Sequence, residues 1–195
     1  RKMEPANTKE RILLTAFKAF LKSGYRDVTI NEVVKELGIT KGAFYHYFES
    51  KDHLLITIME EYCFNFLYEF ADIISSPQTG IKENIEQAAH LIISKLDFNK
   101  QEGIEYGSFL LLFYDSMKRF SYIQDRARAQ YTKIYNLILA KFRLAQETKS
   151  IKPDLDHEAL TLALITMIEG IFFMSEIFDT RLLKEKVPAM VDSFW

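Results

Sequence analysis

The sequence predicts an all-α protein with about nine helices. Apolar residues recur at three- and four-residue spacing through most of its 195 residues, which is the period of an α-helix. Seven Gly and four Pro are few for a chain of this length, so long helices are favoured over turn-rich sheets. A hydrophobic share of 48% and a charged share of 27% are typical of a folded globular chain.

Two helices are predicted before residue 40. The first begins at Asn7, a helix-capping residue with a glutamate three positions later, and ends near Gly24. The second begins after Thr29, with Glu32 as the partner in a capping box. Gly38 ends this short helix, because glycine adopts the left-handed conformation at a helix C-terminus at little cost.

A third short helix is predicted over residues 41–48, after the N-cap Thr40. Phe44 and Phe48, four residues apart, are its inward residues. Its outward side presents two tyrosines, a histidine and a lysine, but no acidic residue. Two short helices joined by a tight turn, the second of which exposes hydrogen-bond donors, form a helix-turn-helix that reads the major groove of DNA.

The stretch KGAFYHYF at 41–48, followed closely by a lysine at 51, resembles the Tet-repressor family of bacterial transcription regulators. Residues 29–30 and 37–39 also match, and the resemblance is close over roughly residues 8–60. It implies a dimeric repressor that binds a palindromic double-stranded DNA operator and is released by a small apolar or aromatic effector. The DNA-contacting residues expected from the motif and the resemblance are Thr29, Thr40, Lys41, Gly42, Ala43, Tyr45, His46, Tyr47 and Lys51.

The remaining chain predicts six further helices, over residues 51–74, 81–96, 104–118, 121–149, 156–178 and 181–194. Residues 75–80 form the clearest loop, and residues 97–103 a polar break. We expect two domains: residues 1–50 form the N-terminal three-helix DNA-binding domain, and residues 51–195 form a larger helical domain for ligand binding and dimerisation. The long helix at 51–74 would join them.

The segment 156–178 is apolar almost all round, so a membrane span is an interpretation to exclude. Glu169 lies in its middle, where an acidic group costs about 2.5–3.5 kcal/mol in a membrane. A helix buried on one side by its own core and on the other by a partner subunit fits better. We therefore expect a homodimer formed by the last two helices, about 156–194, and no membrane partner.

The second half is rich in aromatic residues mixed with a few polar ones, which favours an apolar cavity between helices. The ligand-contacting residues expected there are Phe66, Phe70, Phe109, Phe113, Tyr131, Tyr135, Thr166, Glu169 and Phe173. The alternative is that these side chains are ordinary core. In that case the protein is a DNA-binding dimer whose C-terminal half is only a dimerisation core, without ligand control.

Enzymatic motifs are absent from the sequence. Four scattered histidines form no paired-ligand spacing, and no nucleophile elbow or phosphate-binding loop occurs, so we expect no catalytic, metal or cofactor site. A single cysteine, Cys63, and a polar N-terminus without an apolar signal region favour the cytoplasm. Residues 1–53 hold ten Lys/Arg and seven Asp/Glu, a weakly basic head on an acidic remainder.

Overall fold

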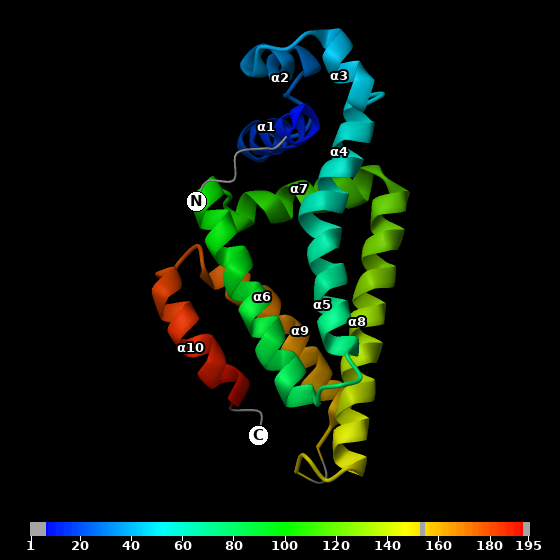
Figure 1. Cartoon of the computed structure of the whole chain (residues 1–195), viewed down its shortest axis with the longest axis vertical. Coiled ribbons are helices and arrows are strands. Elements are labelled where there is room, and N and C mark those ends of the chain that lie inside the picture. The colour runs from blue at the N-terminus through cyan, green and yellow to red at the C-terminus, as the bar shows by residue number, and fades with distance from the viewer. Residues whose placement is uncertain (1–6, 153–154, 193–195) are drawn as a thin grey trace. The chain divides into compact units, whose positions relative to one another are not determined.

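The computed structural model describes residues 7–152 and 155–192, and every regular element in these ranges is a helix (Figure 1). The elements are α1 (Thr8–Ser23), α2 (Ile30–Leu37), α3 (Lys41–Tyr47), α4 (Lys51–Met59), the π-helix η1 (Glu60–Phe64), α5 (Asn65–Ser75), α6 (Ile81–Glu102), α7 (Tyr106–Arg119), α8 (Ser121–Glu147), α9 (His157–Met174) and α10 (Thr180–Asp192). The run from α4 through η1 to α5 has no break, so the described chain contains nine separate helical rods. The predicted all-α class is confirmed.

The chain divides into two compact units. The first contains Arg1–Asn65 and Gln101–Asp125, and the second contains Phe66–Lys100 and Arg126–Trp195. Thus α7 belongs to the same unit as the N-terminal helices, although 55 residues of sequence, 51–105, separate it from the predicted first domain. The predicted domain boundary between residues 50 and 51 separates a DNA-binding part from a ligand-binding and dimerisation part, and this division by function stays a prediction.

The first unit is built around α1, which packs on α2, α4 and α7. Phe17 and Phe20 of α1 and Phe44 of α3 are at most 2% exposed, and Phe48 beyond α3 is 1% exposed. The ring of Phe17 stacks on Tyr62 with centroids 4.4 Å apart. The short α2 and α3 therefore depend on a shared aromatic core, because helices of seven or eight residues are marginal in isolation.

The helix predicted over 51–74 is continuous, but it contains a π-helical turn at Glu60–Phe64. A π turn holds one more residue than an α turn, so the inward face shifts along the sequence. Phe64 is therefore fully buried, whereas Phe66 is half-buried. Burial, and then the nearby carboxylates of Glu61 and Glu102, raise the pKa of Tyr62 to about 12.

The polar break predicted at 97–103 is also wrong for most of its length, because α6 continues to Glu102. Asp97 lies on this continuous helix, where Lys184 of α10 donates a hydrogen bond to its carboxylate. Polar residues on a solvent-facing side do not end a helix, whereas Gly103, with φ of 67°, does. The loop predicted at 75–80 is confirmed in outline, since α5 ends at Ser75 and α6 begins at Ile81.

The second unit contains most of α5 and α6, the main part of α8, and α9 and α10. Its α5–α6 loop is fixed by Lys141, whose Nζ donates to the carbonyl oxygens of Ser76 and Thr79. The last two helices are shorter than predicted, and residues 193–194 lie outside the described residues. By length and by its mean hydropathy of 1.4, α9 alone among the described helices could cross a membrane, and only 22% of it is buried within the chain. Such a helix is weak evidence for a membrane, because an apolar helix that packs on a partner has the same composition.

Candidate nucleic-acid interface

The turn between α2 and α3 is formed by local hydrogen bonds that the sequence predicts. Thr29 caps α2 in a complete capping box, in which Oγ1 accepts from the amide of Glu32 at 3.3 Å and Glu32 accepts from the amide of Thr29 at 2.6 Å. Gly38 closes α2 in the left-handed conformation at φ 66° and ψ 30°. This conformation strains residues with a Cβ, so glycine suits the position. The chain then reverses tightly into Thr40.

Helix α3 presents small and donor-bearing side chains to solvent. Thr40 caps it, with Oγ1 accepting from the amide of Ala43 at 3.1 Å. Lys41, Gly42 and His46 are exposed, and Tyr45 is 51% exposed. A Cβ added to Gly42 would meet only Thr40 Oγ1, at 3.7 Å, so the start of the helix is open to a neighbouring surface. This is the surface that a recognition helix offers to base edges.

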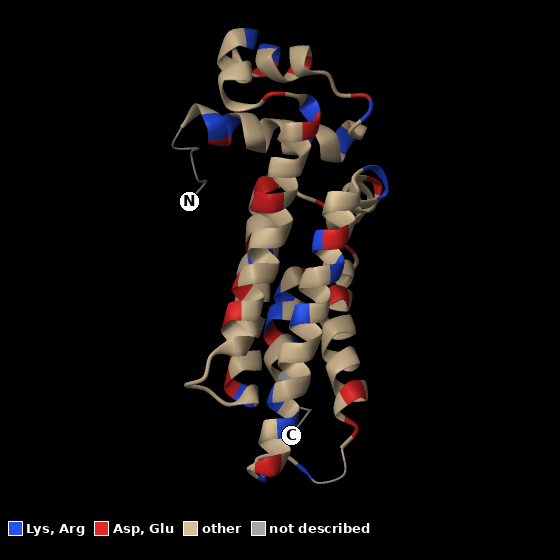
Figure 2. Cartoon of the chain, turned by 90° about the vertical axis from the view of Figure 1, so that its right-hand side faces the viewer, with Lys and Arg blue, Asp and Glu red and all other residues tan. Residues whose placement is uncertain are grey.

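The structure brings seven of the nine predicted DNA-contacting residues together, namely Thr40 and six residues of α3. Of these six, Ala43 and Tyr47 are half-buried. Thr29 lies apart from them at the start of α2, and Lys51 at the start of α4. Positions of Lys and Arg and of Asp and Glu are interspersed over the helices that Figure 2 draws. Helix α3 is an exception at short range, since its first turn has no acidic residue.

Lys51 points to the turn between α1 and α2. Its Nζ lies 4.3 Å from the centroid of the Tyr25 ring and donates to the carbonyl of Arg26 at 3.3 Å. Arg119, at the end of α7, also lies over this ring, with Cζ 4.9 Å from the centroid. The Tyr25 hydroxyl donates to the carboxylate of Asp52. The buried side chain of Tyr25 thus contacts two cations with its ring and donates to a carboxylate with its hydroxyl.

These contacts shift the pKa values of Tyr25 and Lys51. Desolvation, and then the hydrogen bond to Asp52, raise the pKa of the Tyr25 hydroxyl well above its ordinary value. Desolvation, and then the positive charge of Arg119, lower the pKa of Lys51. Arg119 could not be predicted as a member of this cluster, because nothing in a linear pattern joins the end of α7 to the α1–α2 turn.

The predicted ligand-contacting residues are divided between the two units. Phe109 and Phe113 belong to the core of the first unit, with rings stacked at 6.2 Å and in contact with Phe17 and Phe64 respectively. Two others, Phe66 and Phe70, line a small cavity in the second unit together with Tyr131 and Glu169. In this cavity the hydroxyl of Tyr131 donates to Glu169 at 2.7 Å.

The other three predicted ligand-contacting residues do not line that cavity. Tyr135 is half-buried, Phe173 is 50% exposed, and exposed Thr166 donates to the carbonyls of Leu162 and Ala163 of its own helix. All nine roles remain predictions.

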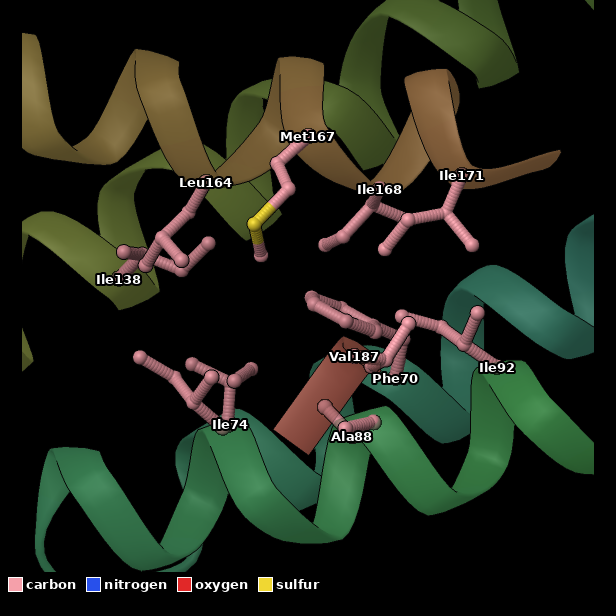
Figure 3. Close-up of a pocket in the computed structure, with 12 residues that line it drawn as sticks. Phe70, Ile74, Ala88, Ile92, Ile138, Leu164, Met167, Ile168, Ile171 and Val187 are labelled. Atoms are coloured by element: carbon pink, nitrogen blue, oxygen red, sulfur yellow. The ribbon is translucent and has the colours of Figure 1, made fainter. Parts of the chain in front are cut away.

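Aliphatic side chains form most of the lining of one cavity in the second unit. Figure 3 shows side chains of α5, α6, α8, α9 and α10 converging on one apolar cavity, with Met167 and Ile168 opposite Phe70 and Ala88. The volume of this cavity is about 20 Å³, as is that of the cavity beside Tyr131. That is space for about one water molecule, far below the ~300–1,000 Å³ of a typical ligand pocket.

Comparison with known proteins gives one family. Residues 12–58 match the family model described as bacterial regulatory proteins, tetR family. An uncharacterised helix-turn-helix transcriptional regulator of Bacillus subtilis, YerO, is 48% identical over 54 residues, which are 28% of this chain and 19% of that protein. The transcriptional repressor NemR of Escherichia coli is 25% identical over 79 residues, 40% of each chain.

The matched stretch thus spans about a fifth of the first relative and two fifths of the second. Solved structures extend the likeness of fold to the whole chain. The ketosteroid transcriptional regulator KstR2 of Mycobacterium tuberculosis superposes with a TM-score of 0.66 at 19% identity, over 96% of this chain and 94% of that one. The relatives are transcriptional regulators and not enzymes. The matched helices are those that form the capped turn and the exposed face of α3, so the helix-turn-helix part of the chain, residues 12–58, is that of the TetR family of bacterial regulatory proteins.

Proposed function

We propose that this protein is a cytoplasmic, sequence-specific repressor that binds a palindromic operator as a homodimer and is released by a small apolar or aromatic molecule. The exposed face of α3 carries the first part of this proposal. Gly42 leaves the start of that helix open, and Lys41, Tyr45 and His46 project from it. Base contacts from such a face select sequence, while phosphate contacts of Lys51, Tyr47 and Thr29 set the register.

The exposed apolar surface of α9 and α10 supports a homodimer. Leu162 is 54% exposed, Phe173 50% and Leu182 45%. Ile177 and Phe178, between the two helices, are 62% and 50% exposed. Large apolar side chains gathered in this way mark an interaction surface. A second copy of the same surface fits best, because two-fold symmetric dimers use one self-complementary patch on both subunits.

Release by a ligand is supported by the relatives and not by the cavities. KstR2 is named as a ketosteroid regulator, and a Bacillus halodurans protein of similar fold is named as a fatty acid degradation regulator. Cavities of about 20 Å³ favour the second candidate, a DNA-binding dimer whose second unit is only a dimerisation core. An effector in that unit would have to separate the aliphatic side chains first.

Selection of binding sites from random DNA at a stated salt concentration tests the proposed function. We expect enrichment of a palindrome with two half-sites, because a two-fold dimer places two α3 helices in successive major grooves, about 34–36 Å apart or more. The variant Leu162→Glu, at a 54% exposed position of α9, should elute as a monomer and lose the palindrome. Enrichment of a single half-site by the unmodified protein would contradict the dimer, and no enrichment would contradict DNA binding.

The substitution Lys51→Ala should weaken binding to all DNA sequences alike and reduce the slope of log affinity against log salt by about one unit. A phosphate contact releases counterions but reads no base, so its loss has this signature. The matched control is Lys133→Ala, at an exposed position of α8 in the second unit, which should leave the slope unchanged. If both variants keep the full slope, Lys51 stays on Tyr25 in the complex and is not a phosphate contact.

A further inference from the structure

The amino group of Lys51, a predicted phosphate contact, is engaged within its own chain. The side chain is half-buried, and Nζ lies over the Tyr25 ring and donates to the carbonyl of Arg26. Transfer of Nζ to a phosphate exchanges these contacts for new ones, because the lysine ammonium group is a single compact cation. The stability of its present site therefore opposes DNA binding.

The ring that holds Lys51 is itself fixed. Tyr25 is 7% exposed, and its ring packs edge-on against that of Phe20, with centroids 5.3 Å apart. The Tyr25 hydroxyl donates to the carboxylate of Asp52. These contacts keep the ring in place when Lys51 moves, so the movement changes only which cations contact the ring.

Arg119, the last residue of α7, is the second cation on this ring. Its Cζ lies 4.9 Å from the centroid, and Lys51 Nζ lies 4.3 Å from the same point. Two positive charges this close repel each other, and a buried ring screens them less than water does. Asp115, 3.8 Å from the guanidinium, offsets only part of this charge, because both side chains of that pair are partly exposed. All these residues belong to the first unit.

The other charges around Lys51 act in the opposite direction. Among the charged groups of the described residues that shift the pKa of Lys51, Arg119 has the largest effect and lowers it. Three carboxylates raise that pKa, namely those of Asp52, Asp27 and Glu32. With these carboxylates present, the cluster has no surplus of positive charge that would make it a site for an anion. Its charges instead set how firmly one lysine is held.

We propose that Arg119 is a positioning residue for DNA binding, which shares the Tyr25 ring with Lys51 and so drives the lysine toward the phosphate backbone without touching DNA. When Lys51 leaves, Arg119 remains on the ring, so the tyrosine keeps a cationic partner. This role rests on the proposed function, because it gives Lys51 a phosphate as its second partner.

A double-mutant cycle on operator affinity tests this role. Arg119→Gln removes the charge and should lower the affinity at least about threefold and reduce the salt slope, because Lys51 then stays on the ring. In the Lys51→Ala background the same substitution should change the affinity less than about 1.5-fold, because the residue through which it acts is absent. Arg119→Lys keeps the charge and should recover most of the loss.

The pattern of the cycle distinguishes positioning from other roles of Arg119. An equal loss in both backgrounds would overturn the proposal, because Arg119 would then contact DNA or support the fold independently of Lys51. No loss in either background would also overturn it. The matched control, Arg143→Gln, removes the same charge at an exposed position of α8 in the second unit and should leave the affinity unchanged. An equal loss in this control would indicate a general effect of charge and would contradict the proposal.

The pKa of Lys51 in the DNA-free protein separates failure of this proposal from failure of the proposed function. NMR of a sample with ¹³C-labelled lysine follows the titration, and Lys51→Ala identifies the signal by its absence. Arg119→Gln should raise this pKa, because a neighbouring positive charge disfavours protonation of the amine.

An unchanged pKa in a protein that binds its operator would overturn this proposal alone. A raised pKa in a protein that binds no DNA would contradict the proposed function, and with it the role of Arg119 in DNA binding. The repulsion between the two cations would still stand in that case.

Discussion

The substitution Gly42→Glu should lower operator affinity by roughly 100-fold or more while leaving the protein folded. A Cβ at this position would meet only Thr40 Oγ1 at 3.7 Å, so the chain accepts the new side chain. Glutamate also favours a helix more than glycine does, by up to about 1 kcal/mol. On the exposed start of α3, however, its carboxylate would face base edges and phosphates. Fluorescence anisotropy with the selected operator measures the affinity, and circular dichroism melting checks the fold.

The chain offers a closely matched control for this variant. Gly107 is the second residue of α7 as Gly42 is of α3, and a Cβ there meets nothing within 4 Å. Gly107→Glu adds the same charge to the same helical position away from α3, and should change operator affinity less than about twofold. Loss of binding in both variants would indicate a general effect of charge. Full binding by Gly42→Glu would show that α3 does not face the DNA.

The substitution Phe44→Ala should destabilise the protein by about 3–5 kcal/mol, the usual cost of truncating a buried phenylalanine. Phe44 is fully buried, and its ring centroid lies 5.7 Å from that of Phe48 and 5.4 Å from that of Tyr45. A loss of this size is a large part of the ~5–15 kcal/mol by which domains are stable. The N-terminal helices should therefore unfold at much lower urea concentration, as followed by circular dichroism, and DNA binding should fall with them.

The neighbouring residue separates packing from recognition. Tyr45 is 51% exposed, so Tyr45→Ala should change the free energy of unfolding by no more than about 0.5 kcal/mol. The same variant should still weaken operator binding, because the tyrosine belongs to the outward face of α3. Equal unfolding midpoints for Phe44→Ala and Tyr45→Ala would contradict the aromatic core beneath the helix-turn-helix.

The parts of the fold that the sequence predicts best are those made by hydrogen bonds between near neighbours. Thr29, Thr40 and Ser50 each cap the helix that follows, with a side-chain oxygen accepting from an amide three residues later. Gly38 ends α2 for an equally local reason. Both partners of each of these interactions lie close together in the sequence, so the sequence predicts where these helices begin and end. The spacing of Phe44 and Phe48 is equally local, so the sequence also predicts which residues of α3 face outward.

The features that the sequence does not predict depend on residues far apart in the chain. The periodicity over 51–74 continues across the π turn, and only packing shows that Phe64 is inward. The aromatic residues of the second half were expected to share one pocket, yet Phe109 and Phe113 pack in the first unit and Phe70 in the second. Aromatic residues at helical spacing predict a buried face of the helix, but the spacing does not specify which other residues pack against that face.

The sequence by itself determined that this protein is all-helical and has a helix-turn-helix at its N-terminus, because caps, a glycine turn and apolar periodicity act over a few residues. The tertiary structure alone decided that α7 joins the first unit and that Arg119 and Lys51 share the ring of Tyr25. These features arise when distant segments exclude water from a common core, and that choice of partners depends on the shapes of whole helices.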